Sequence, residues 1–289
     1  MNLSNRIISF FILLISLLPF WFLYFLSDVL FIVLYYIVGY RKEVVRENLL
    51  AAFPNKSKEE RELIAKKFYI FLADMILETI KMKSIGAEEI KKRIKLNNPE
   101  EIYIHMNANR PVMGITGHYG NWELGIHRLS LMTENPILII YKPLTNKGFE
   151  KIFNDIRARF GAFMVPMRQT FRQILAYKNR PHISMFLSDQ TPARSESNYF
   201  IPFLGQETLM FQGVEKIAQS TNFPVVYCHI NRIRRGYYEC TFTTLFDNPK
   251  TSSTHEITVS HAKFLENIID KKPELWLWSH RRWKHKPTT

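Results

Sequence analysis

The stretch PVMGITGHYGNWELGIHRLSLM, residues 111–132, carries the pattern that decides the fold. Its first six residues form a short apolar run that is typical of a buried strand. A glycine-bounded segment, GHYGN, follows, and the remaining residues have apolar side chains at helical spacing. The stretch therefore predicts a strand, a loop and a helix in succession.

The same succession continues along the chain. Apolar runs predict further strands, and periodic segments predict further helices. The strands are expected at 137–143, 163–166, 182–188 and 224–230, and the helices at 147–159, 169–177, 211–221 and 254–270. Before them, Ser57 and Glu60 form a capping box for one of two helices within 42–83. Alternating strands and helices predict an α/β fold, with a mostly parallel sheet flanked by helices.

Cys228 and Cys240 lie in a segment that predicts two strands around an Arg-Arg-Gly turn. Two cysteines are too few for a disulfide framework, and no Cys-x-x-Cys or His-Glu-x-x-His pattern accompanies them. We therefore expect an antiparallel hairpin that ends the sheet, buried reduced thiols and no metal site.

An apolar segment lies near the N-terminus. Ile7–Leu26 contains no charged residue over 20 positions, which as a helix is roughly 30 Å and matches a hydrocarbon core. This segment predicts a membrane anchor helix, kinked at Pro19. The next apolar run, Val29–Val38, is too short to cross alone, so we expect it at the interface or packed on the domain.

The charges that flank this segment indicate an orientation. Arg41, Lys42 and Arg46 follow it, whereas only Arg6 precedes it. The positive-inside bias therefore predicts a cytoplasmic C-terminal part. We expect residues 1–40 to form the anchor and interfacial segment and residues 41–289 to form one domain.

The chain is basic, with 39 Lys and Arg against 26 Asp and Glu, for a net charge of +13. Such a surface attracts phosphates, anionic headgroups or an acidic protein. Residues 273–284, PELWLWSHRRWK, interleave aromatic and basic side chains. Because an anchor is expected and no nucleic-acid-binding fold is recognisable, we interpret this tail as a membrane-surface belt and expect no nucleic-acid partner.

His118 directly follows the predicted strand, where open α/β sheets place their sites. Glu123 lies five residues later, so the two side chains can meet only if His118 is in the loop and Glu123 on the first helical turn. The carboxylate could then accept a proton from one imidazole nitrogen and leave the other as a general base. From the residues alone, Asp189 fits a turn equally well, and Arg157 and Arg159 fit a solvated helix face.

These residues occur in a set of motifs that resembles the bacterial lipid A biosynthesis acyltransferase family, the late lauroyl and myristoyl transferases and their relatives. GHYGNWE is a His-x-x-x-x-Glu motif, and the other segments follow it in the family's order. They are YKPL at 141–144, Arg-x-Arg-x-Gly at 157–161, SDQTP at 188–192, FIPFLGQETLMFQG at 200–213 and the tail at 273–284.

The resemblance implies a glycerolipid-acyltransferase-like fold and a role for each site residue. His118 would be the general base, Glu123 the carboxylate that orients it, and Asp189 a later acidic site residue. Arg157 would be the active-site arginine, with Arg159 competing for that position.

The resemblance also implies the reaction and its place in the cell. An acyl chain would pass from an acyl carrier protein or coenzyme A to a hydroxyl of a lipid A precursor at the cytoplasmic face of the inner membrane. No metal or organic cofactor is implied. Two alternatives stay open, namely N- or O-acylation of another membrane lipid and a non-catalytic, membrane-tethered lipid-binding protein.

Overall fold

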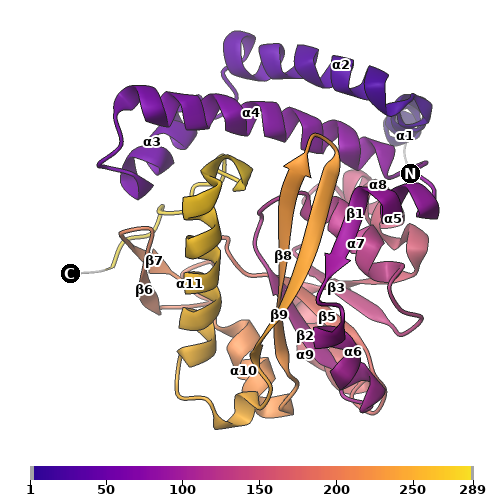
Figure 1. The fold of residues 1–289 in the computed structure, drawn as a ribbon, viewed down its shortest axis with the longest axis vertical. Coiled ribbons are helices and arrows are strands. Elements are labelled where there is room, and N and C mark those ends of the chain that lie inside the picture. Colours follow the sequence, from indigo (N-terminus) through magenta and orange to yellow (C-terminus); the bar gives the residue numbers. More distant parts are fainter. Residues whose placement is uncertain (1–2, 288–289) are drawn as a thin grey trace.

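A seven-stranded sheet forms the centre of the computed structural model, which describes residues 3–287 (Figure 1). Its strand order is β1-β9-β8-β2-β5-β3-β4, and every neighbouring pair is parallel except β8 and β9. The predicted α/β fold with a mostly parallel sheet is confirmed. The strands are β1 Ile94–Asn97, β2 Val112–Thr116, β3 Ile137–Tyr141, β4 Ala162–Pro166, β5 Ile183–Leu187, β8 Val225–Arg234 and β9 Tyr237–Phe246.

Helices cover this sheet, whose central strands are mostly apolar and buried. All five residues of β2 are buried, as expected for a strand covered on both faces. Helix α7 packs against β3 and β4, and α11 packs against β9. The helices between and after the strands are α5 Ala87–Arg93, α6 Glu100–Asn107, α7 Trp122–Ser130, α8 Lys147–Arg157, α9 Thr170–Ala176, α10 Gly213–Thr221 and α11 Glu256–Lys271.

Strands β8 and β9 form the predicted hairpin. Cys228 lies opposite Phe242 and Cys240 opposite Ile230, and both thiols are buried and free, as expected. A second hairpin was not predicted. Its strands are β6 Phe200–Phe203 and β7 Gln206–Leu209, and its turn residues Leu204 and Gly205 both have positive φ.

Two helices precede the sheet, α3 Lys42–Ala52 and α4 Lys58–Lys81. The capping box at the start of α4 is confirmed, since the Glu60 amide donates to the Ser57 hydroxyl and the Ser57 amide donates to the Glu60 carboxylate. Helix α4 is central to the packing, with ten of its residues buried, including the ionisable side chains of Asp74 and Glu78. These two acids need polar partners from elsewhere in the fold.

The N-terminal segment corrects one prediction. It forms α1 Leu3–Leu17 and α2 Phe20–Ile32, and α2 continues into a π-helical turn, Val33–Ile37. The 20-residue stretch expected as one helix is divided at Pro19, which lacks an amide hydrogen and starts α2.

The second apolar run is therefore not a separate segment. Within residues 3–287, the single helix long and apolar enough to cross a membrane is Phe20–Ile37, which includes most of that run. Asp28 lies within this helix, and its carboxylate pairs with Arg235.

Helix α2 lies alongside α4 at one edge of the molecule (Figure 1). Its inner face is polar in places, since Ser27 donates to Asp74 over 2.7 Å and Tyr24 donates to Glu78 over 3.0 Å. Lys81 of α4 donates to two carbonyl oxygens at the end of α1. The outward face carries exposed apolar side chains, namely Trp21, Phe25, Val29 and Ile32.

Candidate active site

The loop after β2 has the predicted geometry, with His118 in the loop and Glu123 on the first turn of α7. Gly120 is required there, because its φ is +64° and a Cβ would lie 2.0 Å from the Ile230 carbonyl oxygen. Asn121 caps α7 by accepting from the Leu124 amide, and it donates to the buried Glu78 carboxylate. The loop is therefore held at both the sheet and α4.

His118 is held by Asp189. The Nδ1 atom of His118 lies 2.6 Å from one Asp189 oxygen, and the His118 backbone amide donates to the other oxygen over 2.9 Å. Trp276 also donates its indole N–H to this carboxylate over 2.8 Å. Asp189 is buried, with 4% of its surface exposed.

This contact corrects the predicted pairing of His118 with Glu123. Thr116 of β2 lies opposite Leu187 of β5 in parallel register. Two residues beyond these, His118 and Asp189 therefore meet at the same edge of the sheet. Glu123 lies on α7 and pairs with Arg157, so Asp189 is the carboxylate that contacts the imidazole.

The Asp189 carboxylate is ionised at neutral pH. Burial alone raises its pKa, but the neighbouring His118 and the hydrogen bonds from His118 and Trp276 outweigh burial and hold the pKa well below its usual range. An ionised carboxylate at Nδ1 favours the tautomer with its proton on Nδ1. In that tautomer the lone pair of the ring is on Nε2.

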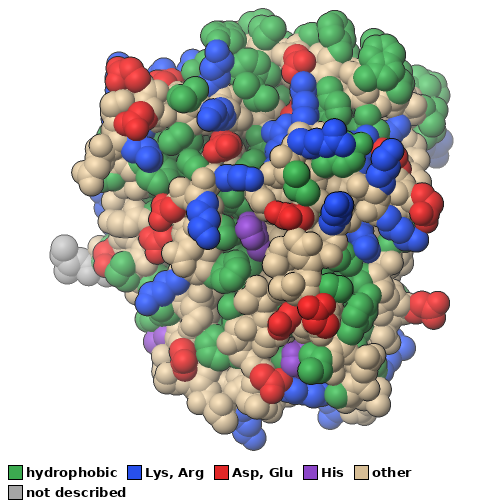
Figure 2. Space-filling view, viewed as in Figure 1, with side chains coloured by type: hydrophobic (Ala, Val, Ile, Leu, Met, Phe, Trp, Pro, Cys, Tyr) green, Lys and Arg blue, Asp and Glu red, His purple; other side chains and the backbone are tan. Residues whose placement is uncertain are grey.

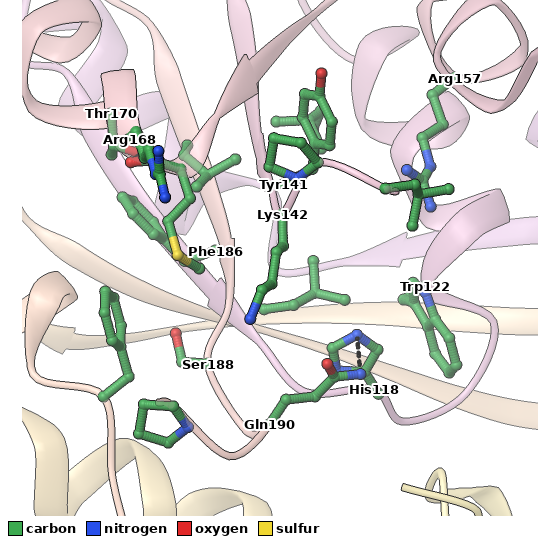
Figure 3. A pocket seen from close by; sticks show the side chains of 18 of the residues that line it. His118, Trp122, Tyr141, Lys142, Arg157, Arg168, Thr170, Phe186, Ser188 and Gln190 are labelled. Atoms are coloured by element: carbon green, nitrogen blue, oxygen red, sulfur yellow. Dashed lines mark hydrogen bonds between the residues drawn. The ribbon is translucent and has the colours of Figure 1, made fainter. Parts of the chain in front are cut away.

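The Nε2 side of the ring faces a cavity of about 780 Å³. The amide nitrogen of Gln190 lies 3.2 Å from His118 Nε2. Figure 3 shows Gln190 beside the ring and Lys142 pointing into the same space. Much of the cavity wall is apolar, including Ile139, Ile140, Phe153, Phe171, Phe186 and Phe211. The cavity therefore combines a polar end around His118 with apolar walls.

Glu123 and Arg157 form a second charged pair at this cavity. Arg157 Nε donates to one Glu123 oxygen over 2.7 Å, and its terminal Nη2 donates to the other. Burial lowers the pKa of Arg157, but the charge and hydrogen bonds of Glu123 outweigh it, so the pKa is raised. The Trp122 indole, which donates to Glu123, stands between the two pairs, with its ring centroid 4.9 Å from that of His118.

Arg159 lies outside the cavity that Arg157 lines. Its guanidinium donates to the carbonyl oxygens of Met82 and Ile85 just beyond α4, and it is absent from the cavity wall. Of the two arginines that compete from the sequence, Arg157 is the one at the cavity.

The aromatic tail is mostly buried, which corrects its interpretation as a membrane-surface belt. Trp276, Trp278 and Arg282 are almost fully buried. The backbone amide of Leu277 donates to the His118 carbonyl over 3.1 Å. The tail is thus part of the wall that supports the His118 loop.

Sequence reasoning missed Gln190 and Trp276 as neighbours of this histidine. The signal for Gln190 was its place beside Asp189 in the SDQTP segment, whereas nothing local links Trp276 to residue 189. Within residues 3–287, no group of three or more His, Cys, Asp or Glu side chains could hold a metal ion.

Comparison with known proteins identifies the family. A model of the bacterial lipid A biosynthesis acyltransferase family matches residues 5–285. The lipid A biosynthesis palmitoleoyltransferase of Escherichia coli is 25% identical over 251 residues, 86% of this chain and 80% of that protein. A lipid A biosynthesis acyltransferase of Haemophilus influenzae is 21% identical over 237 residues, covering 80% of this chain and 72% of its own length.

The lipid A biosynthesis myristoyltransferase of Escherichia coli is 20% identical over 235 residues, 80% of this chain and 71% of that protein. The family match covers both charged pairs and the whole cavity. The chain belongs to the bacterial lipid A biosynthesis acyltransferase family and is an acyltransferase.

Proposed function

We propose that this enzyme transfers a fatty acyl chain from a thioester to a hydroxyl of a lipid A precursor, with His118 as the general base. The observation that carries the proposal is the geometry of His118, which is bound at Nδ1 by the buried Asp189 and faces the cavity through Nε2. A base held in this way can accept a proton without first reorienting. The names of the similar proteins support lipid A as the acceptor class.

The reaction needs one proton to move twice. Nε2 of His118 takes the hydroxyl proton as the oxygen attacks the thioester carbonyl, and Asp189 stabilises the resulting imidazolium. When the tetrahedral intermediate breaks its carbon–sulfur bond, the imidazolium returns the proton to the leaving thiolate. The products are an ester and a free thiol, and the enzyme is regenerated.

Gln190 occupies the place that the acceptor hydroxyl needs. Its amide lies 3.2 Å from Nε2, a distance at which an N–H donates to the lone pair as a hydroxyl would. We infer that the acceptor displaces this amide when it binds. In this arrangement Glu123 holds Arg157 toward the cavity rather than orienting the base.

The cavity suits a charged lipid with a long chain. Its wall is largely apolar, and its volume lies in the usual range of ligand sites. The charged lining consists of Lys142, Arg157 and Arg168 with Glu123, Glu150 and Glu196, and Glu123 pairs with Arg157, so Lys142 and Arg168 are the cations that a lipid phosphate would meet. Helix α8 supplies Phe153 and Arg157 to this wall and contacts α1. A lipid acceptor would therefore enter from beside the apolar N-terminal helices.

We place the enzyme at the inner membrane with residues 41–289 on the cytoplasmic side. Arg41, Lys42 and Arg46 follow the apolar helix Phe20–Ile37, and such charges are retained on that side. An acyl carrier protein or coenzyme A, both cytoplasmic thioester carriers, would then reach the cavity.

The test uses the purified full chain with a radiolabelled acyl thioester and a lipid A precursor. We expect a product heavier by one acyl group, with its label in an ester that mild alkali releases. Acyl carrier protein and coenzyme A thioesters are supplied in separate reactions to identify the donor. Alkali-resistant label would indicate an amide and contradict transfer to a hydroxyl, and no product with either donor would contradict the proposal.

A further inference from the structure

A second hollow, of about 360 Å³, lies at the tip of the β8–β9 hairpin and shares no lining residue with the catalytic cavity. Five of its nine lining residues are Lys or Arg, and one is Glu. Figure 2 shows Lys and Arg side chains gathered on this face, near the apolar edge formed by the N-terminal helices. We call this hollow the basic crevice. Its lining is Lys67, Ile70, Arg232, Ile233, Arg234, Arg235, Lys272, Glu274 and Leu275.

Two of the five cations attach the hairpin to the helices. Arg235 pairs with Asp28 of α2 and Asp74 of α4, and it donates to the Tyr24 carbonyl. Arg232 pairs with the same Asp74. These contacts fix the basic crevice directly beside α2, so it lies within about one helix diameter, roughly 10 Å, of the exposed apolar face.

The other three cations of the basic crevice are not committed to an acidic side chain. Within residues 3–287, none of Lys67, Arg234 and Lys272 forms a salt bridge with an acid. Lys67 is exposed on α4, and the exposed Arg234 lies over the Tyr237 ring at 3.8 Å. Lys272 donates to the neutral oxygens of Asn231 and Arg232.

The surroundings favour a lipid headgroup over a soluble anion. Ile233 is 53% exposed at the hairpin tip, among the cations. Basic residues beside an apolar helix face attract anionic lipid, because the apolar face enters the acyl region while the cations reach the headgroup layer. We propose that the basic crevice binds the phosphate of an anionic phospholipid headgroup, at a site separate from the catalytic cavity.

The test compares two double variants of the full chain. Lys67→Gln with Arg234→Gln removes two crevice charges and spares the arginines that pair with Asp74. Lys178→Gln with Arg180→Gln is the matched control, because it also removes an exposed lysine and an arginine over a tyrosine ring, here Tyr177 at 4.2 Å. Those residues precede β5, at the opposite end of the parallel strands from the hairpin tip.

Each protein is diluted from detergent into vesicles of phosphatidylcholine, with or without phosphatidylglycerol, and floated on a density gradient. For the crevice variant we expect about 25-fold weaker partitioning than wild type into the anionic vesicles, from about fivefold per lost charge. Partitioning into neutral vesicles should be unchanged, since the apolar face is intact. The control variant should partition like wild type into both the neutral and the anionic vesicles.

Three results would overturn the proposal. Equal loss in neutral and anionic vesicles would make these residues structural. Displacement of wild type from anionic vesicles by inorganic phosphate, beyond that by chloride at equal ionic strength, would make the ligand free phosphate. A crevice variant that keeps its lipid preference but no longer binds purified acyl carrier protein would make the crevice a carrier-protein site.

Discussion

Two charged pairs face the same cavity, and they differ in what they can do with a proton. In the His118–Asp189 pair, the carboxylate binds one ring nitrogen and leaves the other facing the cavity. In the Arg157–Glu123 pair, both carboxylate oxygens bind the guanidinium, which cannot give up its proton in a protein. In the proposed mechanism, only the first pair transfers a proton.

This difference assigns proton transfer to the His118–Asp189 pair and substrate positioning to the Arg157–Glu123 pair in the proposed mechanism. The arginine and glutamate are paired with each other through both carboxylate oxygens, whereas the second ring nitrogen of His118 contacts only the Gln190 amide, which a substrate could displace. Trp122 lies between the pairs and contacts both, so the two are neighbours without sharing a hydrogen bond. Mutations that affect the pairs differently test this division.

The largest effect is expected at His118. His118→Ala removes the base, so the acyl-transfer rate should fall by about 10² to 10⁴ while the protein stays folded and membrane-bound. The measurement is transfer of a labelled acyl group, with circular dichroism and flotation as controls. A variant that keeps the wild-type rate would remove His118 from the chemistry.

The second-largest loss of acyl-transfer rate is expected at Asp189. Asp189→Asn keeps the shape but removes the charge that stabilises the imidazolium, and we expect the rate to fall by about 10² to 10³. Adding His118→Ala to it should lower the rate little below His118→Ala alone, because effects within one catalytic unit do not add. Fully additive losses would show that the two residues act independently.

The difference in stability between wild type and Asp189→Asn should depend on pH. Because folding lowers the Asp189 pKa, the pair stabilises the protein above the carboxyl's unfolded pKa of about 3.9 and loses this contribution as pH falls toward the folded value. Wild type should therefore unfold at higher urea than Asp189→Asn at pH 7, and the gap should narrow below about pH 4. A gap independent of pH would argue against an ionised Asp189.

Mutations in the Arg157–Glu123 pair should lower the acyl-transfer rate less. Arg157→Ala removes a cation from the cavity wall and leaves Glu123 with the Trp122 indole as its only remaining side-chain donor among the described residues, so we expect the rate to fall by about tenfold to 10² and the stability by about 1 to 3 kcal/mol. Combining Glu123→Ala with His118→Ala should give additive losses in the logarithm of the rate, since the pairs act separately. Non-additive losses would restore the direct link between Glu123 and His118 expected from the sequence.

The sequence predicts what is local and misses what the topology brings together. The strand, loop and helix around His118, the capping box at Ser57 and the hairpin with its two thiols all depend on residues close in the chain. Asp189 is 71 residues from His118, and the two meet only because β2 and β5 are neighbours in the sheet. The periodicity of apolar residues does not specify the order of strands in the sheet. The acid closer to His118 in the sequence, Glu123, was therefore predicted as its partner.

The other errors have the same origin. The tail was interpreted from its composition, but Trp276 is buried because it pairs with the His118 loop and with Asp189. The N-terminal segment is apolar, as predicted, but Pro19 moves the helix boundary, and Asp28 pairs with Arg235 of the distant β8–β9 hairpin. Periodicity gives the type of each element, and tertiary contacts decide its limits and neighbours.

Arg159 gives the smallest expected effect and is the matched control for Arg157. Both arginines lie at the end of the α8 segment, two positions apart, yet Arg159 donates to the carbonyl oxygens of Met82 and Ile85 outside the cavity. Arg159→Ala should therefore change the transfer rate by less than about twofold. It should lower stability by about 1 kcal/mol, seen as a fall in Tm of about 2 to 4 °C. An inactive Arg159→Ala protein beside an active Arg157→Ala protein would move the arginine of the site two residues along the chain and break the assignment of the second pair.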